Sequence, residues 1–452
     1  MNNIRSRATL EAYRLAGQAS LPLLRARYAQ RVRDGLEQSD RVQEHFGYPS
    51  KPREAGNWVW FHAGNADEVR SLLPLVRLCT AQDLMIIATS TSRYGLELWE
   101  TEAEQNPSVV AQYAPVDVER CANRFLDHWK PDLAITVADQ VWPLITSCLK
   151  QRRISCVVVG GVLSQRCHDF WSVRPMLARR TFRHVEFVAA TDATSADAFR
   201  DLGACDVEVC GDLAFDAPIN TSSSRVEQSF WDKAGLDAAR PTWLAVPANA
   251  DELALCLEAQ RALQMAGSPA VCLLSPPPSM SVASLRSAVE VAGLNFGAPT
   301  AHTDEAWAEG ADILLVAFGA DGERAAVRSQ AIYLGGAFGK EQAGGLSPVP
   351  AILHRLAIAS GEKVERHVSF LSQLHRDKAV RIVGSSEELA GFLSIILNDP
   401  TAQKRMTDGA LSALWSRQGA VNTTYIALDR YLRPLAYKAR MENLLPVNQA
   451  AE

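Results

Sequence analysis

The residue best suited to chemistry stands at the start of a helical pattern. Glu68 comes a few residues after an apolar run and follows His62 and Gly64. A carboxylate in the first turn of a helix that follows a parallel strand can act as a general base at the carboxyl edge of the sheet. The alternative takes Asn65 as an N-cap and Glu68 as an acid that only complements the helix dipole.

The same turn occurs twice in the chain. Residues 58–68 read WVWFHAGNADE, and residues 242–252 read TWLAVPANADE. Each is an apolar run with a tryptophan, a turn of small residues, Asn-Ala-Asp-Glu and a helical pattern. A strand–loop–helix unit that occurs once in each half predicts two similar α/β domains facing a common cleft. The second copy can be the same capping device.

Another predicted strand end carries polar side chains. Residues 137–143 read VADQVWP, and Pro143 suits the first turn of a following helix. Asp139 can bind an acceptor hydroxyl or cap that helix, and Trp142 can line a cleft, although core packing is the commoner role of a tryptophan. His62 alone is more often a hydrogen-bonded structural residue than a ligand. The chain has no HExxH, GxSxG or clustered His/Asp pattern, so we expect no metal site.

A glycine-rich segment lies in the second half. Residues 334–348 read LGGAFGKEQAGGLSP, which ends one predicted strand and opens a helix with Ser347 as N-cap and Pro348 as first residue. Paired glycines let backbone amides approach a phosphate closely. The segment is neither a Walker A loop nor GxGxxG, and a surface loop explains it equally well.

The composition is that of a globular protein with two domains. The 452 residues exceed what one typical core holds, and 47% of them are hydrophobic and 21% charged. The net charge of -5 gives no support to nucleic-acid binding, and no stretch of about 18 apolar residues predicts a transmembrane helix. The nine cysteines form no CxxC pair, and Cys156, Cys210 and Cys272 lie inside apolar runs, as is typical of a reduced, cytosolic protein.

The N-terminal segment differs from the rest in charge. Residues 1–33 hold seven arginines and one acid, Glu11, interleaved with leucines and tyrosines. A basic, interrupted amphipathic segment can lie on an anionic membrane surface. The alternative is a helix that packs on its own domain with a solvated basic face.

Apolar runs alternate with helical patterns in both halves, which predicts parallel sheets with helices on both faces. The expected strands are 57–62, 83–89, 132–137, 155–159, 186–190, 206–210, 242–246, 270–274, 312–316, 331–334 and 379–383. The expected helices are 67–80, 92–105, 117–128, 140–151, 174–181, 194–202, 250–264, 281–292, 349–359, 386–397, 401–416 and 420–438.

The domain organisation follows from this alternation. We expect a basic segment at 1–45, an acceptor-side Rossmann-like domain at 46–220, a linker at 221–241 and a donor-side Rossmann-like domain at 242–420. A C-terminal helix at 421–440 can cross back to the first domain.

The chain resembles the 3-deoxy-D-manno-octulosonic acid (Kdo) transferases almost end to end. Residues 62–68 (HAGNADE) match the family's His-Ala-x-Ser-x-Gly-Glu. The further matching segments are 113–117 (YAPVD), 124–132 (RFLDHWKPD), 142–143 (WP), 163–166 (LSQR), 211–218 (GDLAFDAP), 243–245 (WLA), 335–336 (GG), 344–345 (GG) and 417–420 (RQGA).

The resemblance implies a GT-B fold and transfer of Kdo from CMP-Kdo to a lipid A precursor at the cytoplasmic face of the inner membrane. No metal or other cofactor is implied, since the sugar nucleotide is a substrate, and Glu68 matches the catalytic base. The implied acceptor-binding residues are His62, Gly64, Asn65, Asp139, Trp142, Ser164 and Arg166. The implied donor-binding residues are Gly211, Asp212, Gly335, Gly336, Gly344, Gly345 and Ser347.

Departures from the family concentrate on the donor side. Pro350 stands where a glutamate is expected to hold the ribose, and Ala214 replaces a lysine. Residues 275–280 (SPPPSM) replace Pro-Arg-His-Pro-Glu-Arg, so two arginines and a histidine are lost, and Gln140 replaces a second acid. Each charge-assisted contact to a phosphate contributes roughly 1.5–3 kcal/mol, so these losses weaken ordinary CMP-Kdo binding unless other residues substitute.

Three functions remain open at this point. The first is a glycosyltransferase of this family, with Glu68 as base. The second is a non-catalytic or donor-altered homologue that binds a glycolipid or a partner enzyme at the membrane. The third is a GT-B enzyme of another chemistry, such as a nucleotide-sugar epimerase. The surviving Glu68 favours the first, and the missing donor arginines favour the second.

Overall fold

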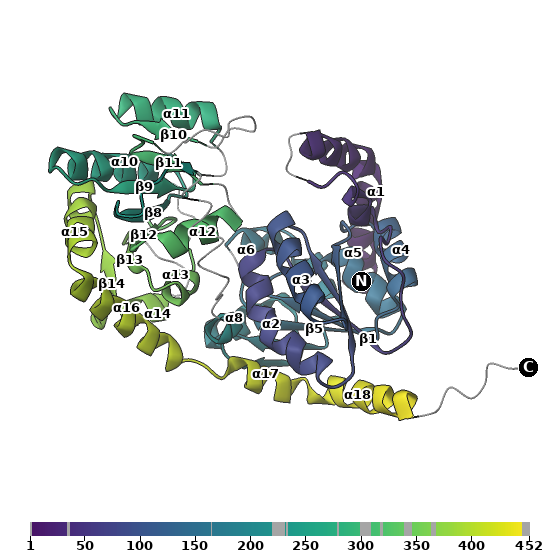
Figure 1. Cartoon of the computed structure of the whole chain (residues 1–452). Coiled ribbons are helices and arrows are strands. Elements are labelled where there is room, and N and C mark those ends of the chain that lie inside the picture. The colour runs from purple at the N-terminus through teal and green to yellow at the C-terminus, as the bar shows by residue number, and fades with distance from the viewer. Residues whose placement is uncertain are drawn as a thin grey trace, which may run out of the picture. The chain divides into compact units, whose positions relative to one another are not determined.

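The protein divides into two compact units in a computed structural model of the whole chain (Figure 1). Unit 1 comprises residues 1–218 and 418–452, and unit 2 comprises residues 219–417. The structure describes residues 2–33, 37–163, 165–218, 231, 234–277, 280–298, 309–316, 320–338, 346–362 and 368–444.

Unit 1 is built on a parallel sheet whose strand order is β3-β2-β1-β4-β5-β6-β7. The strands are β1 (Trp58–Ala63), β2 (Met85–Ser90), β3 (Val109–Tyr113), β4 (Leu133–Val137), β5 (Ser155–Gly161), β6 (Phe187–Ala190) and β7 (Val207–Val209). The helices are α1 (Asn2–Arg33), η1 (Val42–Phe46), α2 (Ala66–Thr80), α3 (Arg93–Gln105), α4 (Glu119–Trp129), α5 (Pro143–Gln151), α6 (Gln165–Ser172), α7 (Pro175–Phe182), α8 (Ala193–Leu202), η2 (Leu213–Asp216), α17 (Ala420–Ala427) and α18 (Asp429–Leu444).

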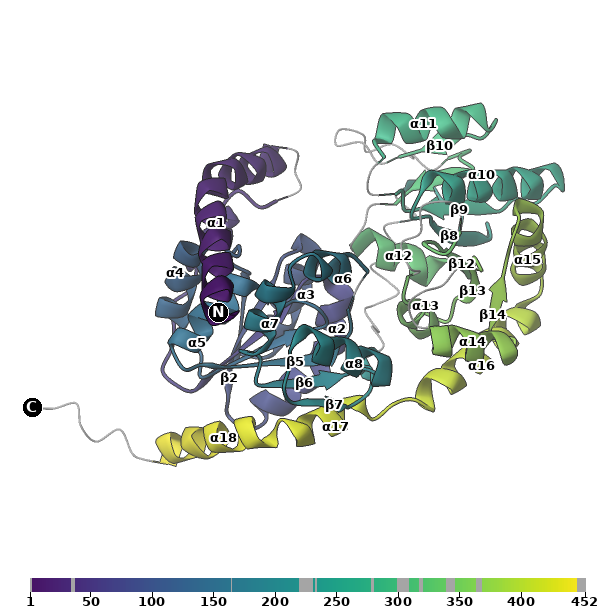
Figure 2. The ribbon, with the colours of Figure 1, turned by 180° about the vertical axis from the view of Figure 1, so that it is seen from behind.

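Helices cover both faces of this sheet because its strands are buried on both sides (Figures 1 and 2). Along β1, Val59 and Phe61 pack against α2, α3, α17 and α18. Trp58 and Trp60 alternate with them and pack against α4 and α5 on the other face. His62 continues this second face, so its ring points toward α5 rather than toward α2.

Unit 2 repeats the plan with the parallel strand order β10-β11-β9-β8-β12-β13-β14. The strands are β8 (Thr242–Val246), β9 (Val271–Leu274), β10 (Phe296–Gly297), β11 (Ile313–Leu315), β12 (Ala331–Leu334), β13 (Ala357–Ser360) and β14 (Val380–Ile382). The helices are α10 (Ala250–Met265), α11 (Val282–Val291), α12 (Ala320–Arg328), α13 (Val349–Leu353), α14 (Val368–Arg376), α15 (Ser386–Asn398) and α16 (Pro400–Trp415).

The C-terminal helices belong to unit 1. Asp216 accepts hydrogen bonds from the backbone amides of Gly419 (2.8 Å) and Val421 (2.7 Å), which caps α17. Leu428 and Leu432 then enter the core beside α2 and the sheet. Residues 445–452 lie outside the described residues.

Several elements differ from the expectation. The short strand β10 and the helices α6, α12 and α14 are not among the expected elements. Strand β3 was not expected, although Val109–Tyr113 forms the edge of the unit 1 sheet beside β2. The helix expected over 349–359 is wrong: α13 ends at Leu353, Arg355 takes a left-handed φ of 56°, and residues 357–360 form the buried strand β13. A left-handed residue stops a right-handed helix and turns the chain into the sheet.

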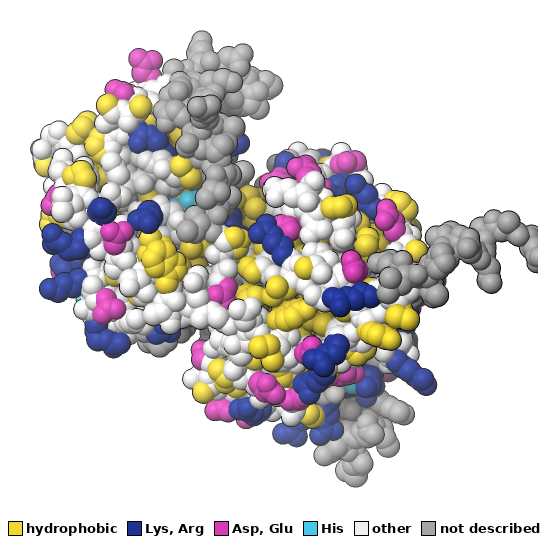
Figure 3. All heavy atoms as spheres, turned by 60° about the horizontal axis from the view of Figure 1, so that its bottom comes forward, with side chains coloured by type: hydrophobic (Ala, Val, Ile, Leu, Met, Phe, Trp, Pro, Cys, Tyr) yellow, Lys and Arg dark blue, Asp and Glu magenta, His cyan; other side chains and the backbone are white. Residues whose placement is uncertain are grey.

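The predicted linker, residues 221–241, falls mostly outside the described residues up to 233. Its described part belongs to unit 2, where Trp231 is buried and its indole nitrogen donates to the carbonyl of Arg324 (3.3 Å). Basic and acidic side chains are interspersed on the face of the molecule that Figure 3 shows.

Candidate functional site

The candidate site of unit 1 lies where the strand order reverses. β1 is paired with β2 on one side and with β4 on the other, so the segments that follow β1 and β4 diverge. Ligands of open α/β sheets bind at such a point, outside the carboxyl ends of the strands. Glu68 stands in the first turn of α2, after β1. Ala138, with a left-handed φ of 55°, turns the chain sharply after β4 and brings the polar segment 139–142 to the same edge.

The carboxyl group of Glu68 closes the turn between β1 and α2. The backbone amide of Gly64 donates to Oε2 (2.6 Å), and the Asn65 side-chain amide donates to Oε1 (2.7 Å). Asn65 also accepts from the backbone amide of Glu68 (3.1 Å), so the expected N-cap is confirmed. Because Glu68 is partly exposed and receives one backbone donor, its oxygens retain acceptor capacity toward a ligand.

The electrostatics of Glu68 are those of a base that works near neutral pH. Burial raises its pKa to about 7. The hydrogen bond from Gly64 acts in the opposite direction and lowers the pKa, but it does not cancel the effect of burial. The negative charge of Asp139 raises the pKa further. A carboxyl group with a pKa close to the working pH is well matched to taking a proton from a hydroxyl.

His62 is a neutral residue of the second face of the sheet. Its Nδ1 atom lies 2.9 Å from the hydroxyl of Thr89, and its ring packs against Trp142 with centroids 4.6 Å apart. Burial lowers the pKa of His62 to about 3. Hydrogen bonds with Thr89 and Gln140 raise the pKa, but they offset only part of this shift. His62 therefore stays uncharged at neutral pH.

The side chain of Gln140 lies next to both Gly64 and His62. A Cβ atom added to Gly64 would lie 2.6 Å from the side-chain nitrogen of Gln140, so a side chain at residue 64 would displace the end of Gln140. A small cavity behind Gln140, between β4 and α5, is lined by His62, Trp142 and Ile145 among others. It has room for about one water molecule, so a sugar ring cannot enter it.

Trp142 and α5 are held by an acid that the sequence reasoning did not single out. Asp117 is half-buried and accepts from the backbone amides of Leu144 (3.0 Å) and Ile145 (2.9 Å) at the start of α5. Burial raises the pKa of Asp117 to about 6, against these amide hydrogen bonds and one from Tyr13 of α1. Asp117 thus joins α1 to the helix that carries Trp142. Its place in the matched YAPVD segment was the available signal.

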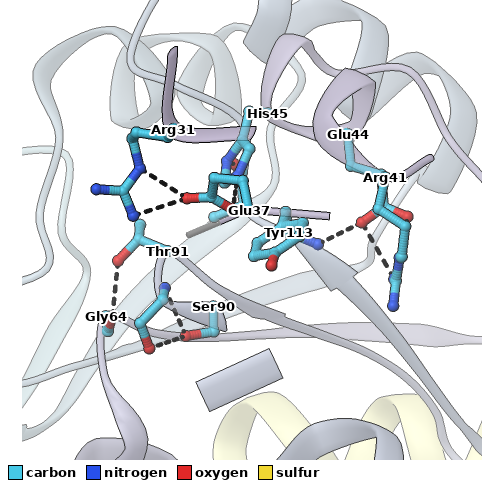
Figure 4. Close-up of polar contacts among 11 residues, drawn as sticks. Arg31, Glu37, Arg41, Glu44, His45, Gly64, Ser90, Thr91 and Tyr113 are labelled. Atoms are coloured by element: carbon cyan, nitrogen blue, oxygen red, sulfur yellow. Dashed lines mark hydrogen bonds and ion pairs between the residues drawn. The ribbon is translucent and has the colours of Figure 1, made fainter. Parts of the chain in front are cut away.

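The neighbouring strand ends complete the edge (Figure 4). The hydroxyl of Thr91 donates to the carbonyl of Gly64 (2.7 Å), which fixes the turn before Glu68. Further along, the buried Glu37 binds Arg31 of α1 (2.9 Å) and lies 3.5 Å from His45. α1 is therefore fastened beside the end of β3.

The donor-side residues of the sequence prediction belong to different units. Gly211 and Asp212 follow β7 in unit 1: Gly211 has a φ of 94° and leaves room for Ala420, and Asp212 caps η2 through the amide of Ala214 (2.9 Å). Gly335 and Gly336 follow β12 in unit 2, where the amide of Gly336 donates to the buried Glu252 (2.7 Å).

The structure describes only some of the remaining predicted residues. Ser347 accepts weakly from the amide of Val349 (3.4 Å) at the start of α13. Ser164, Gly344 and Gly345 lie outside the described residues, and Arg166 belongs to α6 although its side chain is not described. Within the described part of the chain, no group of three His, Cys, Asp or Glu side chains is arranged to hold a metal ion.

The sequence matches one protein family. The family model described as 3-Deoxy-D-manno-octulosonic-acid transferase (kdotransferase) matches residues 40–217. The "Probable 3-deoxy-D-manno-octulosonic acid transferase, mitochondrial" of Arabidopsis thaliana is 30% identical over 162 residues, which are 35% of this chain and 36% of that protein. The 3-deoxy-D-manno-octulosonic acid transferase of Haemophilus influenzae is 24% identical over 409 residues, which are 87% of this chain and 91% of that protein.

Solved structures agree on the architecture. A glycosyltransferase from Rickettsia africae aligns with a TM-score of 0.53 at 10% identity, covering 84% of this chain and 99% of that one. A UDP-GlcNAc 2-epimerase from Neisseria meningitidis aligns with a TM-score of 0.51 at 13% identity, covering 83% of this chain and all (100%) of that one. At such low identity the likeness shows the fold alone: two parallel-sheet α/β domains of the GT-B type.

Proposed function

We propose that this chain is a glycosyltransferase of the Kdo transferase family, because residues 40–217 match the model of that family and the Haemophilus influenzae relative aligns along most of the chain. It moves a Kdo-like sugar from a CMP-activated donor to a lipid A-type glycolipid acceptor. The likeness to the Haemophilus influenzae enzyme along 87% of the chain supports the whole activity rather than one half of it.

The observation that supports this proposal most directly is the position of Glu68 and the raised pKa of its carboxyl group. Glu68 is half-buried at the point where the strand order of unit 1 reverses, and burial of its carboxyl group raises the pKa to about 7. In the reaction, the acceptor hydroxyl gives its proton to Glu68 as its oxygen attacks the anomeric carbon of the donor sugar. The bond from that carbon to the phosphate oxygen breaks, and CMP leaves.

The direct test is sugar transfer from CMP-Kdo to a lipid A precursor, with Glu68→Gln beside the wild type. Losing the base should lower turnover by about a hundredfold to ten-thousandfold. Asp67→Asn is the matched control, because Asp67 is exposed next to Glu68 and pairs with Arg70 on the helix surface (2.8 Å). Equal turnover in wild type and Glu68→Gln would reject Glu68 as base.

The alternative is a homologue that binds glycolipid or a partner enzyme at the membrane without transferring a sugar. Calorimetry with CMP and CMP-Kdo separates the two. The proposed transferase requires saturable binding of CMP, whereas no detectable binding at millimolar nucleotide would reject CMP-Kdo as the donor. The comparisons favour the transferase, since the matched relatives are described as transferases.

We infer a peripheral position at the cytoplasmic face of the inner membrane, with α1 as the contact. One side of α1 packs on its own unit: Leu10 enters the core beside α7, and Arg14 and Arg31 are paired with Glu119 and Glu37. On the other side Leu15 and Leu23 are 61% and 73% exposed. Exposed leucines on a helix rich in arginine suit an anionic bilayer surface. Among the described helices, none is long and apolar enough to cross a membrane.

Co-sedimentation with anionic vesicles tests this contact. Deleting residues 1–33 would also remove Leu10 from the core, so point variants on the exposed side are sharper. Leu23→Glu should reduce binding strongly, because a charge replaces a leucine that would enter the headgroup region. Val291→Glu, at a residue 85% exposed in unit 2, is the control. A contact through α1 would be contradicted if both variants lost vesicle binding equally, or if neither variant lost it.

A further inference from the structure

Glu252 occupies in unit 2 the position that Glu68 occupies in unit 1, and it is completely buried (0% exposed). It stands in the first turn of α10, after β8, with Asn249 as N-cap accepting from the amide of Glu252 (2.9 Å). Its Oε2 atom accepts from the backbone amide of Ala248 (2.7 Å). This much repeats the turn around Glu68.

Three further donors come from across the sheet. The turn after β12 directs three successive backbone amides at the carboxylate, from Gly336 (2.7 Å), Ala337 (3.0 Å) and Phe338 (3.0 Å). Successive amides that converge on one anion form a nest, the arrangement that binds phosphates in many proteins. Here the anion is a side chain of the protein itself.

The paired glycines of this turn are explained by the carboxylate. A Cβ atom on Gly335 would lie 2.5 Å from Oε2 of Glu252 and 2.4 Å from the carbonyl oxygen of Val246. Gly336 has a φ of 89°, which a residue with a side chain adopts only with strain. Both glycines are therefore needed to wrap the turn around Glu252.

We propose that Glu252 is a built-in anion that positions the 335–338 turn, and that the donor phosphate is not bound by the amides of this turn. This inference rests on the proposed transferase function, because it concerns that donor site. All three amides are already satisfied, and a phosphate brought to them would meet the charge of Glu252. Glu252 is thus a positioning residue, acting through the turn on whatever part of the glycine-rich segment meets the donor.

Chemical rescue tests the nest without reference to activity. Glu252→Ala removes a CH₂–COO⁻ group, which acetate replaces atom for atom. We expect the variant to melt about 10 °C or more below the wild type, since four buried amides lose their acceptor. Acetate should restore much of this difference, whereas chloride at the same ionic strength should not. A melting temperature that does not respond to acetate would overturn the nest.

Two controls guard this measurement. Glu68→Ala should show no comparable acetate effect, because Glu68 is partly exposed and receives one backbone donor. If Glu252→Ala folds only in acetate, recovery of folded protein on refolding with and without acetate gives the same answer. Gly335→Ala is the second variant: its Cβ atom occupies the carboxylate position, so acetate should not rescue it.

Binding of CMP tests the link to the donor site. If the wild type binds CMP, Glu252→Ala should bind it at least about tenfold more weakly, and acetate should restore the affinity. Unchanged CMP affinity in Glu252→Ala would overturn the positioning role. If the wild type itself binds no CMP, the proposed donor fails, while the melting experiment still decides whether the nest exists.

Discussion

The first turns of α2 and α10 place the same four residue types, Asn-Ala-Asp-Glu, at the same point of two similar sheets, yet their glutamates have different surroundings. Glu68 is partly exposed and accepts from one backbone amide. Glu252 is fully buried and accepts from four. The asparagine caps the helix in both, so capping is the shared role and does not distinguish them.

The difference comes from the segment opposite each glutamate. In unit 2 the turn after β12 offers three amides, which make Glu252 a structural anion. In unit 1 burial is the main cause that raises the pKa of Glu68, and the negative charge of Asp139, in the corresponding turn after β4, adds to it. A carboxylate surrounded by donors is held in place, whereas a buried one beside another acid binds a proton more readily. The surroundings of each glutamate thus depend on the neighbouring strand end as well as on the tetrapeptide.

The largest expected effect is a loss of transfer activity in a variant of Glu68. Glu68→Gln should lose about a thousandfold in turnover while its melting temperature stays close to that of the wild type, because the amide preserves the hydrogen bond from Gly64. Transfer rates and melting curves on the same preparation measure both. A variant that unfolds instead would place Glu68 in the structural class of Glu252.

Glu252→Gln should show the opposite order. A neutral amide cannot satisfy four converging N–H groups, and its own NH₂ faces donors, so the free energy of unfolding should fall by about 3 kcal/mol or more. Denaturant unfolding curves measure this loss. If stability is unaffected, the four hydrogen bonds do not hold the turn, and the contrast with Glu68 disappears.

The fold was predicted well where periodicity is clear and poorly where short apolar runs are ambiguous. Both sheets and their helices follow from the alternation of patterns, and GT-B follows from the resemblance. The run 356–360 has no period that separates strand from helix, and Arg355 gives no hint of its left-handed conformation. Strand β3 was missed because the polar Gln112 interrupts it, yet Gln112 is buried and accepts from the indole of Trp129 (3.0 Å).

The site shows the same limit. Sequence reasoning placed Glu68 and Asn65 correctly in a first turn, because these contacts are local. It could not assign the donors of Glu252, since Gly336 lies 84 residues further along the chain. For the same reason the paired glycines fit a phosphate loop and a surface loop equally well by sequence, and the phosphate loop stays a prediction for Gly344 and Gly345.

A smaller effect tests the acid pair of unit 1. The pKa of Glu68 lies above its ordinary value of 4.5, so the folded state binds a proton more readily than the unfolded state, and this group loses stability as pH rises from about 4.5 to about 7. Asp139→Asn should lower that pKa. We expect the rise of turnover with pH to move to lower pH, and stability to fall less over this window. His62, with its pKa lowered to about 3, cannot supply this titration. If the pH profile of turnover does not shift in Asp139→Asn, the charge of Asp139 does not raise the pKa of Glu68.

The smallest effect compares the two caps. Replacing Asn65 by alanine should cost about 1 kcal/mol of stability, as is usual for an N-cap. Asn249→Ala should cost more, because the side-chain amide of Asn249 donates to the carbonyl of Phe338 in the nest turn (3.0 Å), whereas that of Asn65 donates to Glu68 in an exposed contact (2.7 Å). Thermal unfolding of both variants decides the order. Equal losses would mean that the bond to Phe338 contributes no more than the exposed bond to Glu68.

The clamp of Asp216 on the start of α17 has a consequence for how the chain is made. Because residues 418–444 return to unit 1, unit 2 is an insertion within the sequence of unit 1. During synthesis all of unit 2 is translated before Leu428 and Leu432 exist to complete the core of unit 1. A chain that ends at residue 417 therefore contains the whole sequence of the insertion but not the whole sequence of its host, and unit 1 is completed last.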